Sequence, residues 1–568
     1  MSINTRSSLN LNKARNERNL PMQGLMMNRP LKISDIITFA SENYPNVEVV
    51  SVRSEGDIHR TNYLKIYKRI SQLAHALGSL GIKKGDRIAT LAWNGYRHLE
   101  LYYAISGIGA VCHTINPRLS NSQLIYIINH AKDKLIFIDL AFVKLIENVK
   151  DSLSPDVRIV VLTEKNYMPE TSLTIECYED LISNKSEIFK WPDFEENTAA
   201  SLCYTSGTTG EPKGTLYTHR STVLHAMMIS ISLSDSLKEG RKVLPVVPLF
   251  HVNAWGLPYA APLTGAGLVF PGPKLDGESL YSLMESEEVY SAWGVPTVWL
   301  GLLQTISKKK KTPLSFGDVV IGGSSAPRSM IETFENLGIN VCHAWGMTEM
   351  SPVGTQGNIP HSHNRLSLKE KIDLKAKHGR RLFGVELKIV GENGKILPND
   401  GKAQGNLYVQ GHAITAGYFN NESATRAAFD ADGWFCTGDI ATIDSDGYLT
   451  IVDRSKDLIK SGGEWISSID LENVAMSHPD ILNCSAIASP HPLWGERPIL
   501  IVIPVEGIKP QKKTIIDLLK TQFSKWQIPE DILFVDKLPL TATGKVSKLT
   551  LRNEYAKYFL KQETETET

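Results

Sequence analysis

The sequence predicts an α/β protein in which a large N-terminal domain of parallel α/β sheets is followed by a small β-barrel-like unit and a small α+β C-terminal domain. Three changes of pattern along the 568 residues predict this order. Short apolar runs alternate with helical segments over the first two thirds, hairpin signals follow about Pro360, and a mixed pattern begins beyond Asp453. Short buried strands separated by helices are typical of a parallel sheet that is covered on both faces.

At the start of the chain, segments with helical spacing of apolar residues alternate with short apolar runs typical of strands. Apolar residues recur at helical spacing at Ile66, Ile70, Leu73, Leu77 and Leu80, and Gly81 ends this predicted helix. A buried strand is predicted at 88–92, and a second helix around 100–106. Further short apolar strands are predicted at 134–139, 158–163, 200–204, 243–247, 319–321 and 341–345.

Residues 243–273 form a long stretch without Asp, Glu, Lys or Arg. The stretch exceeds the roughly 20 residues that a membrane-spanning helix needs. Five prolines would break such a helix repeatedly: Pro245, Pro248, Pro258, Pro262 and Pro271. We therefore expect buried strands and loops that line a pocket, and no integral membrane segment.

The last third of the chain predicts two smaller units. Strands at 382–390 and 405–411, turns at 392–394 and 444–447, and a strand at 448–452 predict the β unit, at about 361–453. Helices near 469–476 and 513–524 and strands at 484–489 and 499–505 predict the C-terminal domain. The expected divisions are a polar arm at 1–20, the N-terminal domain at 21–453, the C-terminal domain at 454–560 and a tail at 561–568.

The composition excludes several classes of protein. Lys plus Arg and Asp plus Glu both number 61, so the net charge is zero and a polyanion such as nucleic acid is not an expected partner. The apolar fraction of 42% excludes a disordered chain. Six cysteines without a C-x-x-C pair fit buried thiols in a reducing cytoplasm. A polar N-terminal arm is favoured over a transit peptide, and the expected location is cytoplasmic.

The strongest local signal is a loop that follows the strand at 200–204. Its glycines allow the backbone to turn tightly and to point N–H groups inward, and its hydroxyls and Lys213 add further donors. These residues are Thr205, Ser206, Gly207, Thr208, Thr209, Gly210, Lys213 and Gly214. The loop differs from the G-x-x-x-x-G-K-[ST] pattern, because Pro212 and Lys213 stand at its Gly-Lys positions. The residues predict a loop that binds phosphate oxygens.

This loop and five further motifs resemble, in the same order, those of the adenylate-forming superfamily, which includes acyl-CoA synthetases, luciferases and nonribosomal adenylation domains. The further motifs lie at 322–327, 343–349, 434–439, 453–464 and 539–545. Each is weak alone, since a Gly-Asp turn or a lysine near a C-terminus is common, but the six together span about residues 21–548. The resemblance implies an AMP-binding N-terminal domain and a mobile C-terminal domain.

The resemblance also implies the substrates and the residues that would bind them. ATP, Mg²⁺ and CoA are implied, with a carboxylic acid that is first converted to acyl-AMP. The implied ATP- and AMP-binding residues are Thr205, Ser206, Gly207, Thr208, Thr209, Gly210, Gly323, Ser324, Ser325, Ala326, Pro327, His343, Ala344, Trp345, Gly346, Thr348, Asp439, Arg454 and Lys545.

The implied catalytic residues are Lys213, Thr348, Glu349 and Lys545, with Glu349 as the ligand of Mg²⁺. Their chemistry suits the reaction, because a carboxylate and ATP are both anions and need cations and positioning rather than a nucleophile. Mg²⁺ prefers one or two carboxylates together with phosphate oxygens.

The resemblance implies a hinge and an acceptor site in the C-terminal part. Lys456 stands at the hinge position, where many relatives carry Asp. The implied CoA-site residues are Lys460, Ser461, Gly462, Gly463 and Trp465. We expect the small domain to rotate about Lys456, so that Lys545 leaves before the thiol enters.

The acyl pocket is expected around an apolar segment at 248–256, whose residues are similar to those of medium- and long-chain fatty acyl-CoA ligases and 3-methylmercaptopropionate-CoA ligases. The expected lining residues are His251, Trp255, Trp293, Val295 and Gly323. The leading hypothesis is an AMP-forming acyl-CoA ligase for a fatty or other apolar acid. The alternatives are an acyl-AMP ligase that loads a carrier protein, and a non-catalytic nucleotide-binding relative. A homodimer is a candidate assembly.

Overall fold

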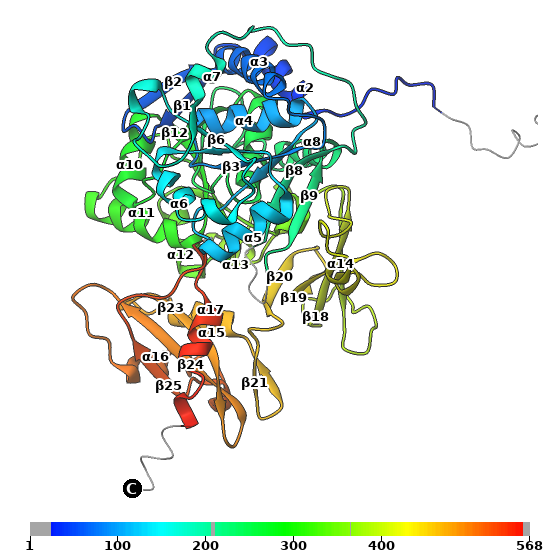
Figure 1. Cartoon of the computed structure of the whole chain (residues 1–568). Helices are drawn as coiled ribbons and strands as arrows, with labels where there is room; N and C mark the ends of the chain where they lie inside the picture. Colours follow the sequence, from blue (N-terminus) through cyan, green and yellow to red (C-terminus); the bar gives the residue numbers. More distant parts are fainter. Residues whose placement is uncertain (1–23, 206–210, 364, 543, 561–568) are drawn as a thin grey trace, which may run out of the picture.

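The computed structural model describes residues 24–205, 211–363, 365–542 and 544–560. The predicted arm at 1–20 and tail at 561–568 lie outside these residues. The described strands form four sheets, of nine, seven, five and four strands. In Figure 1 the two larger sheets form the upper part of the molecule, the four-stranded sheet lies beside them, and the five-stranded sheet lies below.

The nine-stranded sheet is parallel in its centre and antiparallel at both edges. In spatial order its strands are β16 (Arg380–Arg381), β15 (Val353–Gln356), β14 (Asn340–Gly346), β13 (Asp318–Ile321), β12 (Val289–Gly294), β10 (Lys242–Pro245), β11 (Gly267–Phe270), β1 (Glu48–Val52) and β2 (Ile58–Asn62).

The seven-stranded sheet is parallel except for its last pair. In spatial order its strands are β7 (Ile175–Cys177), β6 (Arg158–Val161), β5 (Leu135–Ile138), β3 (Arg87–Leu91), β4 (Val111–Thr114), β8 (Ala199–Tyr204) and β9 (Gly214–Thr218). Side chains of β5 alternate between two apolar clusters, Leu135 and Phe137 on one face and Ile136 and Ile138 on the other. This period of two confirms that both faces are covered.

Helices fill the space between the two large sheets and cover their outer faces. Apolar residues of the inner helices join residues of both sheets in one cluster, and α4 contacts strands of both. The inner helices are α2 (Ile33–Asn43), α3 (Tyr63–Ser79), α4 (Tyr96–Gly107), α8 (His219–Ser232) and α9 (Leu257–Thr264). The outer helices include α10 (Gly277–Ser286), α11 (Pro296–Lys309) and α12 (Arg328–Asn336) on the larger sheet, and α5 (Asn121–Ala131) and α6 (Val143–Glu147) on the smaller. The shorter α7 (Tyr178–Ile182) contacts α3, and α13 (Leu368–Ala376) contacts α12.

The expectation of only strands and loops at 243–273 was wrong, because α9 lies within this stretch. Pro258 stands in the first turn, where a missing N–H costs nothing. Pro262 lies inside the helix and cannot donate to the carbonyl of Pro258. The hydroxyl of Tyr103 donates to that carbonyl instead, at 2.7 Å. A buried neighbour therefore replaces the hydrogen bond that the proline removes.

The β unit is an antiparallel sheet of β17 (Val385–Val390), β18 (Gly405–Gly411), β19 (Phe435–Ile443) and β20 (Leu449–Arg454), with the short helix α14 (Glu422–Ala428) between β18 and β19. Among the described residues β17 and β20 do not pair with each other, so the sheet is open where a barrel would close.

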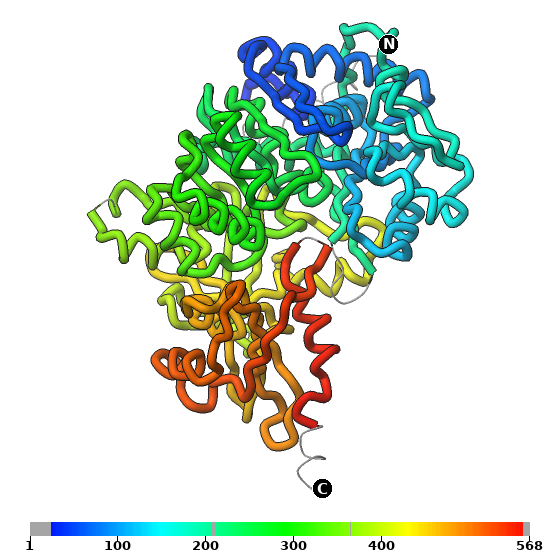
Figure 2. Tube along the Cα trace, turned by 90° about the vertical axis from the view of Figure 1, so that its left-hand side faces the viewer, coloured from blue at the N-terminus to red at the C-terminus, as the bar shows by residue number. Residues whose placement is uncertain are grey.

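The C-terminal unit combines five strands and three helices. Its strands are β22 (Glu464–Ile466), β21 (Ile459–Ser461), β24 (Gly495–Pro504), β23 (Ile481–His491) and, parallel to β24, β25 (Asp531–Phe534). Its helices are α15 (Ser468–Ala475), α16 (Lys512–Leu519) and α17 (Lys548–Glu554). Figure 2 shows that the segment just before α17, drawn in red, extends from this unit up to the large part of the molecule.

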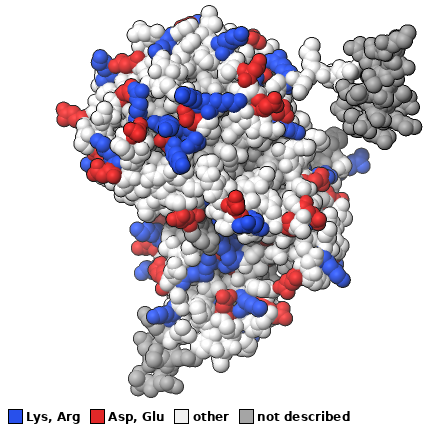
Figure 3. Space-filling model, turned by 45° about the vertical axis from the view of Figure 1, so that its right-hand side comes forward, with Lys and Arg blue, Asp and Glu red and all other residues white. Residues whose placement is uncertain are grey.

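The surface carries both signs of charge. In Figure 3 basic and acidic side chains are interspersed on the face shown, over the large and the small units alike. This pattern agrees with the neutral balance of the sequence. Within the described ranges no helix has the length and apolar character to cross a membrane.

Candidate functional site

The base of the predicted phosphate loop is an antiparallel pair, β8 and β9, in which Tyr204 lies opposite Gly214. The backbone N–H of Thr205 donates to the carbonyl of Lys213 at 2.9 Å, and the N–H of Lys213 donates to Oγ1 of Thr205 at 3.2 Å. These two bonds close the loop at its ends. The other predicted loop residues, Ser206, Gly207, Thr208, Thr209 and Gly210, lie outside the described part of the chain.

Tyr418 connects the predicted catalytic residues Lys213 and Glu349. The Lys213 ammonium lies over the Tyr418 ring, 5.0 Å from its centroid, and the Tyr418 hydroxyl donates to Oε1 of Glu349 at 2.7 Å. The sequence analysis did not single out Tyr418, since an aromatic residue in a loop carries no periodic signal.

Thr348 and Glu349 lie just after strand β14, separated from it by Met347, and are both buried. The carbonyl of Thr348 accepts from the Tyr217 hydroxyl at 2.5 Å, and the carbonyl of Glu349 accepts from the N–H of Thr415 at 2.8 Å. Burial raises the pKa of Glu349, while the hydrogen bond from Tyr418 lowers it. The segment is thus fixed through its backbone, so the side chains of Thr348 and Glu349 are not needed to hold it in place.

Glu349 would have to hold a cation together with a substrate. In the part of the chain that the structure describes, no group of three or more His, Cys, Asp or Glu residues could hold a metal ion. A single buried carboxylate that shares the ion with phosphate oxygens fits the preference of Mg²⁺. The donor set therefore fits Mg²⁺ that is held jointly by Glu349 and phosphate oxygens.

The loop at 322–327, expected beside the adenine, joins β13 to α12 and contains Gly323, Ser324, Ser325, Ala326 and Pro327. Gly323 has a φ of 81°, which side chains rarely adopt. A Cβ on Gly322 would stand 2.9 Å from the carbonyl oxygen of Ala344, so the ends of β13 and β14 approach closely here. Ala344, Trp345 and Gly346 belong to β14, so this loop and strand form one surface.

His343 supports this loop from within the protein. Its ring is fully buried and its Nε2 accepts from the N–H of Ala326 at 3.2 Å. The ring of His378 lies 4.4 Å away, and burial lowers the pKa of His343 to about 4. The imidazole is therefore neutral and orients the loop, whereas its predicted contact with the nucleotide stays a prediction.

Asp439, the residue expected at the ribose, is held by two donors from different sheets. Trp345 on β14 donates from Nε1 to Oδ2 at 3.1 Å, and Nε of Arg454 lies 2.7 Å from Oδ1. Asp439 and Arg454 face each other on β19 and β20. Burial raises the pKa of Asp439, and the positive charge of Arg454 works against this. Trp345 thereby connects the nine-stranded sheet to the β unit.

Lys545 reaches this surface from the C-terminal unit. Its turn is closed by the N–H of Thr541, which donates to the Lys545 carbonyl at 2.7 Å. Cε of Lys545 lies 3.5 Å from the position of a Cβ on Gly323. Burial and, to a smaller extent, the charge of Arg454 lower the pKa of Lys545 to about 8, while the charge of Asp439 opposes them. The structure thus brings Lys545, Gly323, Asp439 and Arg454 together from four separate motifs.

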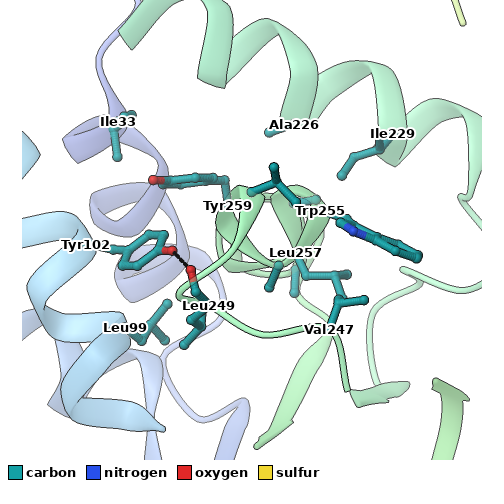
Figure 4. Packing of buried hydrophobic residues seen from close by; sticks show 14 of the residues in the cluster. Ile33, Leu99, Tyr102, Ala226, Ile229, Val247, Leu249, Trp255, Leu257 and Tyr259 are labelled. Atoms are coloured by element: carbon teal, nitrogen blue, oxygen red, sulfur yellow. Dashed lines mark hydrogen bonds between the residues drawn. The ribbon is translucent and has the colours of Figure 1, made fainter. Parts of the chain in front are cut away.

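The expected acyl pocket adjoins Gly323 on the other side. The Trp255 indole would lie 3.7 Å from a Cβ on Gly323, and Cγ1 of Val295 would lie 3.1 Å from it. In Figure 4 the indole of Trp255 points away from Tyr102 and Tyr259, which occupy the opposite side of the same apolar cluster. Apolar side chains therefore converge on Gly323 next to Lys545.

The backbone that carries Trp255 is strained. Four successive non-glycine residues adopt left-handed φ values: Val252 (43°), Asn253 (52°), Ala254 (44°) and Trp255 (56°). Such conformations are costly for β-branched and bulky residues and tend to occur at functional sites. The preceding turn is held by the Tyr102 hydroxyl, which donates to the carbonyl of Leu249 (Figure 4).

Two further predicted pocket residues belong to this region, of which Trp293 is fully buried and His251 is half-buried. Burial lowers the pKa of His251 to about 3, and the nearby charge of Lys545 contributes. Trp293 is fully buried, donates from Nε1 to Oγ of Ser291 at 3.1 Å, and belongs to the same apolar cluster as Trp255. His251 is therefore neutral and lies near Lys545, at the polar end of the expected pocket.

The residues expected at the CoA site form a hairpin of β21 and β22. The N–H of Lys460 donates to Glu496 at 2.8 Å, Arg497 donates to Oγ of Ser461 at 3.0 Å, and the Lys460 ammonium lies 5.2 Å from the ring centroid of Trp465. In Figure 1 this hairpin lies on the side of the small unit that faces away from the large sheets. The observed arrangement therefore places Lys545, and not this hairpin, beside Gly323, Asp439 and Arg454, the residues expected to bind the nucleotide.

Both glycines of the hairpin turn have positive φ, 59° at Gly462 and 92° at Gly463. The N–H of Gly462 donates to the carbonyl of Trp494 at 2.9 Å. Trp494 is half exposed beside the turn, and the sequence analysis missed it. Lys456, the expected hinge, lies between β20 and β21, and burial lowers its pKa.

Comparison with protein-family models matches most of the chain. A model described as AMP-binding enzyme matches residues 38–419, and one described as AMP-binding enzyme C-terminal domain matches residues 470–545. Among solved structures, an anthranilate CoA ligase in complex with anthranoyl-AMP has a TM-score of 0.82 at 23% identity, covering 93% of this chain and 98% of that chain. At this identity the likeness concerns the fold.

Three curated relatives are similar over nearly their whole length. A 3-methylmercaptopropionyl-CoA ligase of Ruegeria lacuscaerulensis is 48% identical, covering 94% of this chain and 99% of the relative. A medium-chain fatty-acid–CoA ligase of Ectopseudomonas oleovorans is 46% identical, covering 95% and 99%. A long-chain fatty-acid–CoA ligase of Thermus thermophilus is 45% identical, covering 94% and 97%.

Proposed function

We propose a substrate class and a division of roles for this chain, which belongs to the AMP-binding enzyme family and is an ATP-dependent, AMP-forming acyl-CoA ligase. The proposed substrate is a medium- or long-chain fatty acid. Two relatives at 45–46% identity carry such names, and apolar side chains of Trp255 and Val295 converge beside Gly323. The second candidate is 3-methylmercaptopropionate, which the name of the 48% identical relative favours.

In the first step the substrate carboxylate attacks the α-phosphorus of ATP, which forms acyl-AMP and releases pyrophosphate. Asp439 would accept the ribose hydroxyls, and the loop that contains Gly323 would cover the adenine. Lys545, Lys213 and Thr348 would face the phosphates. The position of Lys545 carries this proposal, because its Cε stands next to Gly323 between the expected acyl pocket and the Asp439–Arg454 pair. A buried cation there opposes the repulsion between the two anions.

In the second step the CoA thiol attacks the acyl carbonyl, and AMP leaves. We propose that Lys545 leaves before the thiol enters, because the C-terminal unit rotates about Lys456 between the two steps. The rotation would bring the hairpin of β21 and β22 to the site.

Three further features are part of the proposal. Mg²⁺, bound by Glu349 and the phosphates, would supply positive charge at the phosphates. A cytoplasmic location agrees with six free cysteines, five of which are buried. A homodimer is proposed as the assembly, and sedimentation analysis would test it.

The test is a panel of carboxylic acids, short to long and including 3-methylmercaptopropionate, incubated with the protein, MgATP and CoA. AMP and acyl-CoA are quantified by mass spectrometry, with and without CoA. Equal amounts of AMP and acyl-CoA that peak with medium or long chains would support the proposal. A peak at 3-methylmercaptopropionate would favour the second candidate. AMP without acyl-CoA would point to a carrier protein, and no turnover with any acid would contradict an enzymatic role.

A further inference from the structure

The turn that carries Lys545 is held against the large domain by two side chains that donate hydrogen bonds to its backbone carbonyls. Nδ2 of Asn116 donates to the carbonyl of Ala542 at 3.0 Å, and Oγ1 of Thr297 donates to the carbonyl of Gly544 at 3.0 Å. Both acceptors lie within three residues of Lys545. These two bonds therefore fix the segment from which the lysine projects.

The two donors come from the two different large sheets. Asn116 follows β4 of the seven-stranded sheet, and Thr297 lies in the first turn of α11, which follows β12 of the nine-stranded sheet. Both β4 and β12 pair in parallel with a neighbouring strand, and Asn116 and Thr297 lie beyond the carboxyl ends of these strands. In α/β proteins the functional loops lie at this end of a parallel sheet. The turn enters between the two sheets.

The amide of Asn116 is oriented before the turn arrives. Its Oδ1 accepts from the N–H of Arg118 at 3.0 Å, so its Nδ2 has to point the other way, toward Ala542. Asn116 is buried, with 8% of its surface exposed. The Asn116 amide is therefore already oriented, and it loses little conformational entropy when the turn docks.

Both bonds are neutral, and this suits a contact that must break in every cycle. Two ion pairs near the turn, Lys548 with Glu472 and Arg552 with Asp457, have both partners inside the C-terminal unit. These pairs would therefore stay intact when the unit moves. A neutral hydrogen bond has a small net contribution, because water replaces it when it opens. The two contacts that hold the backbone of the turn can therefore form and break without separating an ion pair of their own.

We propose that Asn116 and Thr297 are positioning residues that hold Lys545 in place for acyl-AMP formation and have no part in the transfer to CoA. They act through the carbonyls of Ala542 and Gly544 and do not touch the substrates. This inference rests on the proposed role of Lys545, because it assigns to the two side chains the placement of that lysine.

The test measures the two half-reactions separately in T297V, N116D, T297S and K545A. Thr297→Val keeps the shape and removes the hydroxyl, and Asn116→Asp keeps the acceptor for Arg118 and removes the donor. Acyl-AMP formation is followed in single turnovers with ATP and acid, and acyl transfer is followed from synthetic acyl-AMP with CoA. Loss of one neutral hydrogen bond corresponds to about three- to tenfold in rate.

We expect T297V to form acyl-AMP about three- to tenfold more slowly, and N116D to be slowed at least as much, because its carboxylate also repels the Ala542 carbonyl. Both variants should transfer the acyl group at least as fast as the unaltered enzyme. Thr297→Ser, which retains the hydroxyl, should restore acyl-AMP formation. Equal slowing of both half-reactions, or equal rates in T297V and T297S, would overturn the proposal. Full acyl-AMP formation by K545A would instead show that the role of Lys545 is wrong, and the positioning role would be wrong with it.

Discussion

Nε of Arg454 lies 2.7 Å from Oδ1 of Asp439 across the last two strands of the β unit, at the point where the chain passes to the C-terminal unit. The second oxygen of Asp439 is held by Trp345. The carboxylate is thereby fixed in place on a strand that precedes the proposed hinge at Lys456. A nucleotide bound to Asp439 would keep its position while the C-terminal unit moves.

Replacement of Asp439 by Asn should weaken ATP binding without unfolding the protein. The amide retains the size of the carboxylate but loses the charge that pairs with Arg454 and would accept the ribose hydroxyls. We expect Kd for ATP to rise about ten- to hundredfold, as for the loss of hydrogen bonds to a charged group. Isothermal titration calorimetry measures this, with the thermal midpoint as a control. An unchanged Kd would contradict the placement of the ribose.

Acyl-AMP formation should lose activity as the pH rises through about 8. The pKa of Lys545 is lowered to about 8, so the lysine is protonated below this pH and loses its charge above it. Because kcat/KM reports groups of the free enzyme, its alkaline limb should have a midpoint near pH 8. Lys545→Arg keeps the charge and should move the limb beyond pH 10. The same limb in both proteins would assign the titration to another group.

Tyr418→Phe should raise the Mg²⁺ concentration that half-saturates activity. The hydroxyl of Tyr418 donates to Glu349, whose pKa burial already raises. Without this bond the carboxyl retains its proton more readily and binds a cation less well. Removal of such a supporting partner costs about ten- to hundredfold in metal affinity. A Mg²⁺ titration checks this: full recovery at high Mg²⁺ is expected, and an unshifted curve would exclude this role for Tyr418.

Thr215→Val should stabilise the protein. Thr215 is fully buried on β9, and its hydroxyl has no hydrogen-bond partner among the described residues. Valine has nearly the same shape and carries no polar group to desolvate. The expected gain in the free energy of unfolding is about 1 kcal/mol, visible as a higher midpoint in urea. A lower midpoint would show that the hydroxyl has a partner.

The proximity of the candidate site residues could be predicted because they follow strands in long, ordered motifs. The loops after β13 and β14 lie at one edge of the nine-stranded sheet, since neighbouring parallel strands end together, whereas the loop after β8 belongs to the seven-stranded sheet. Tyr418, Asn116 and Thr297 could not be predicted, because single side chains that contact a carboxylate or a backbone carbonyl leave no periodic pattern. Helix α9 could not be predicted because Pro262 removes one of its hydrogen bonds. Tyr103, which lies 159 positions before Pro262 in the sequence, supplies a replacement bond that no local pattern indicates.

The position of Lys545 is tested most directly by comparing the two half-reactions in K545A. Acyl-AMP formation from ATP and a fatty acid should fall by about a hundredfold or more, as for removal of a charged group that stabilises a transition state. Transfer from synthetic acyl-AMP to CoA should proceed at the rate of the unaltered enzyme. A K545A protein that forms acyl-AMP normally, or that loses both half-reactions equally, would contradict the role of Lys545 in the first step.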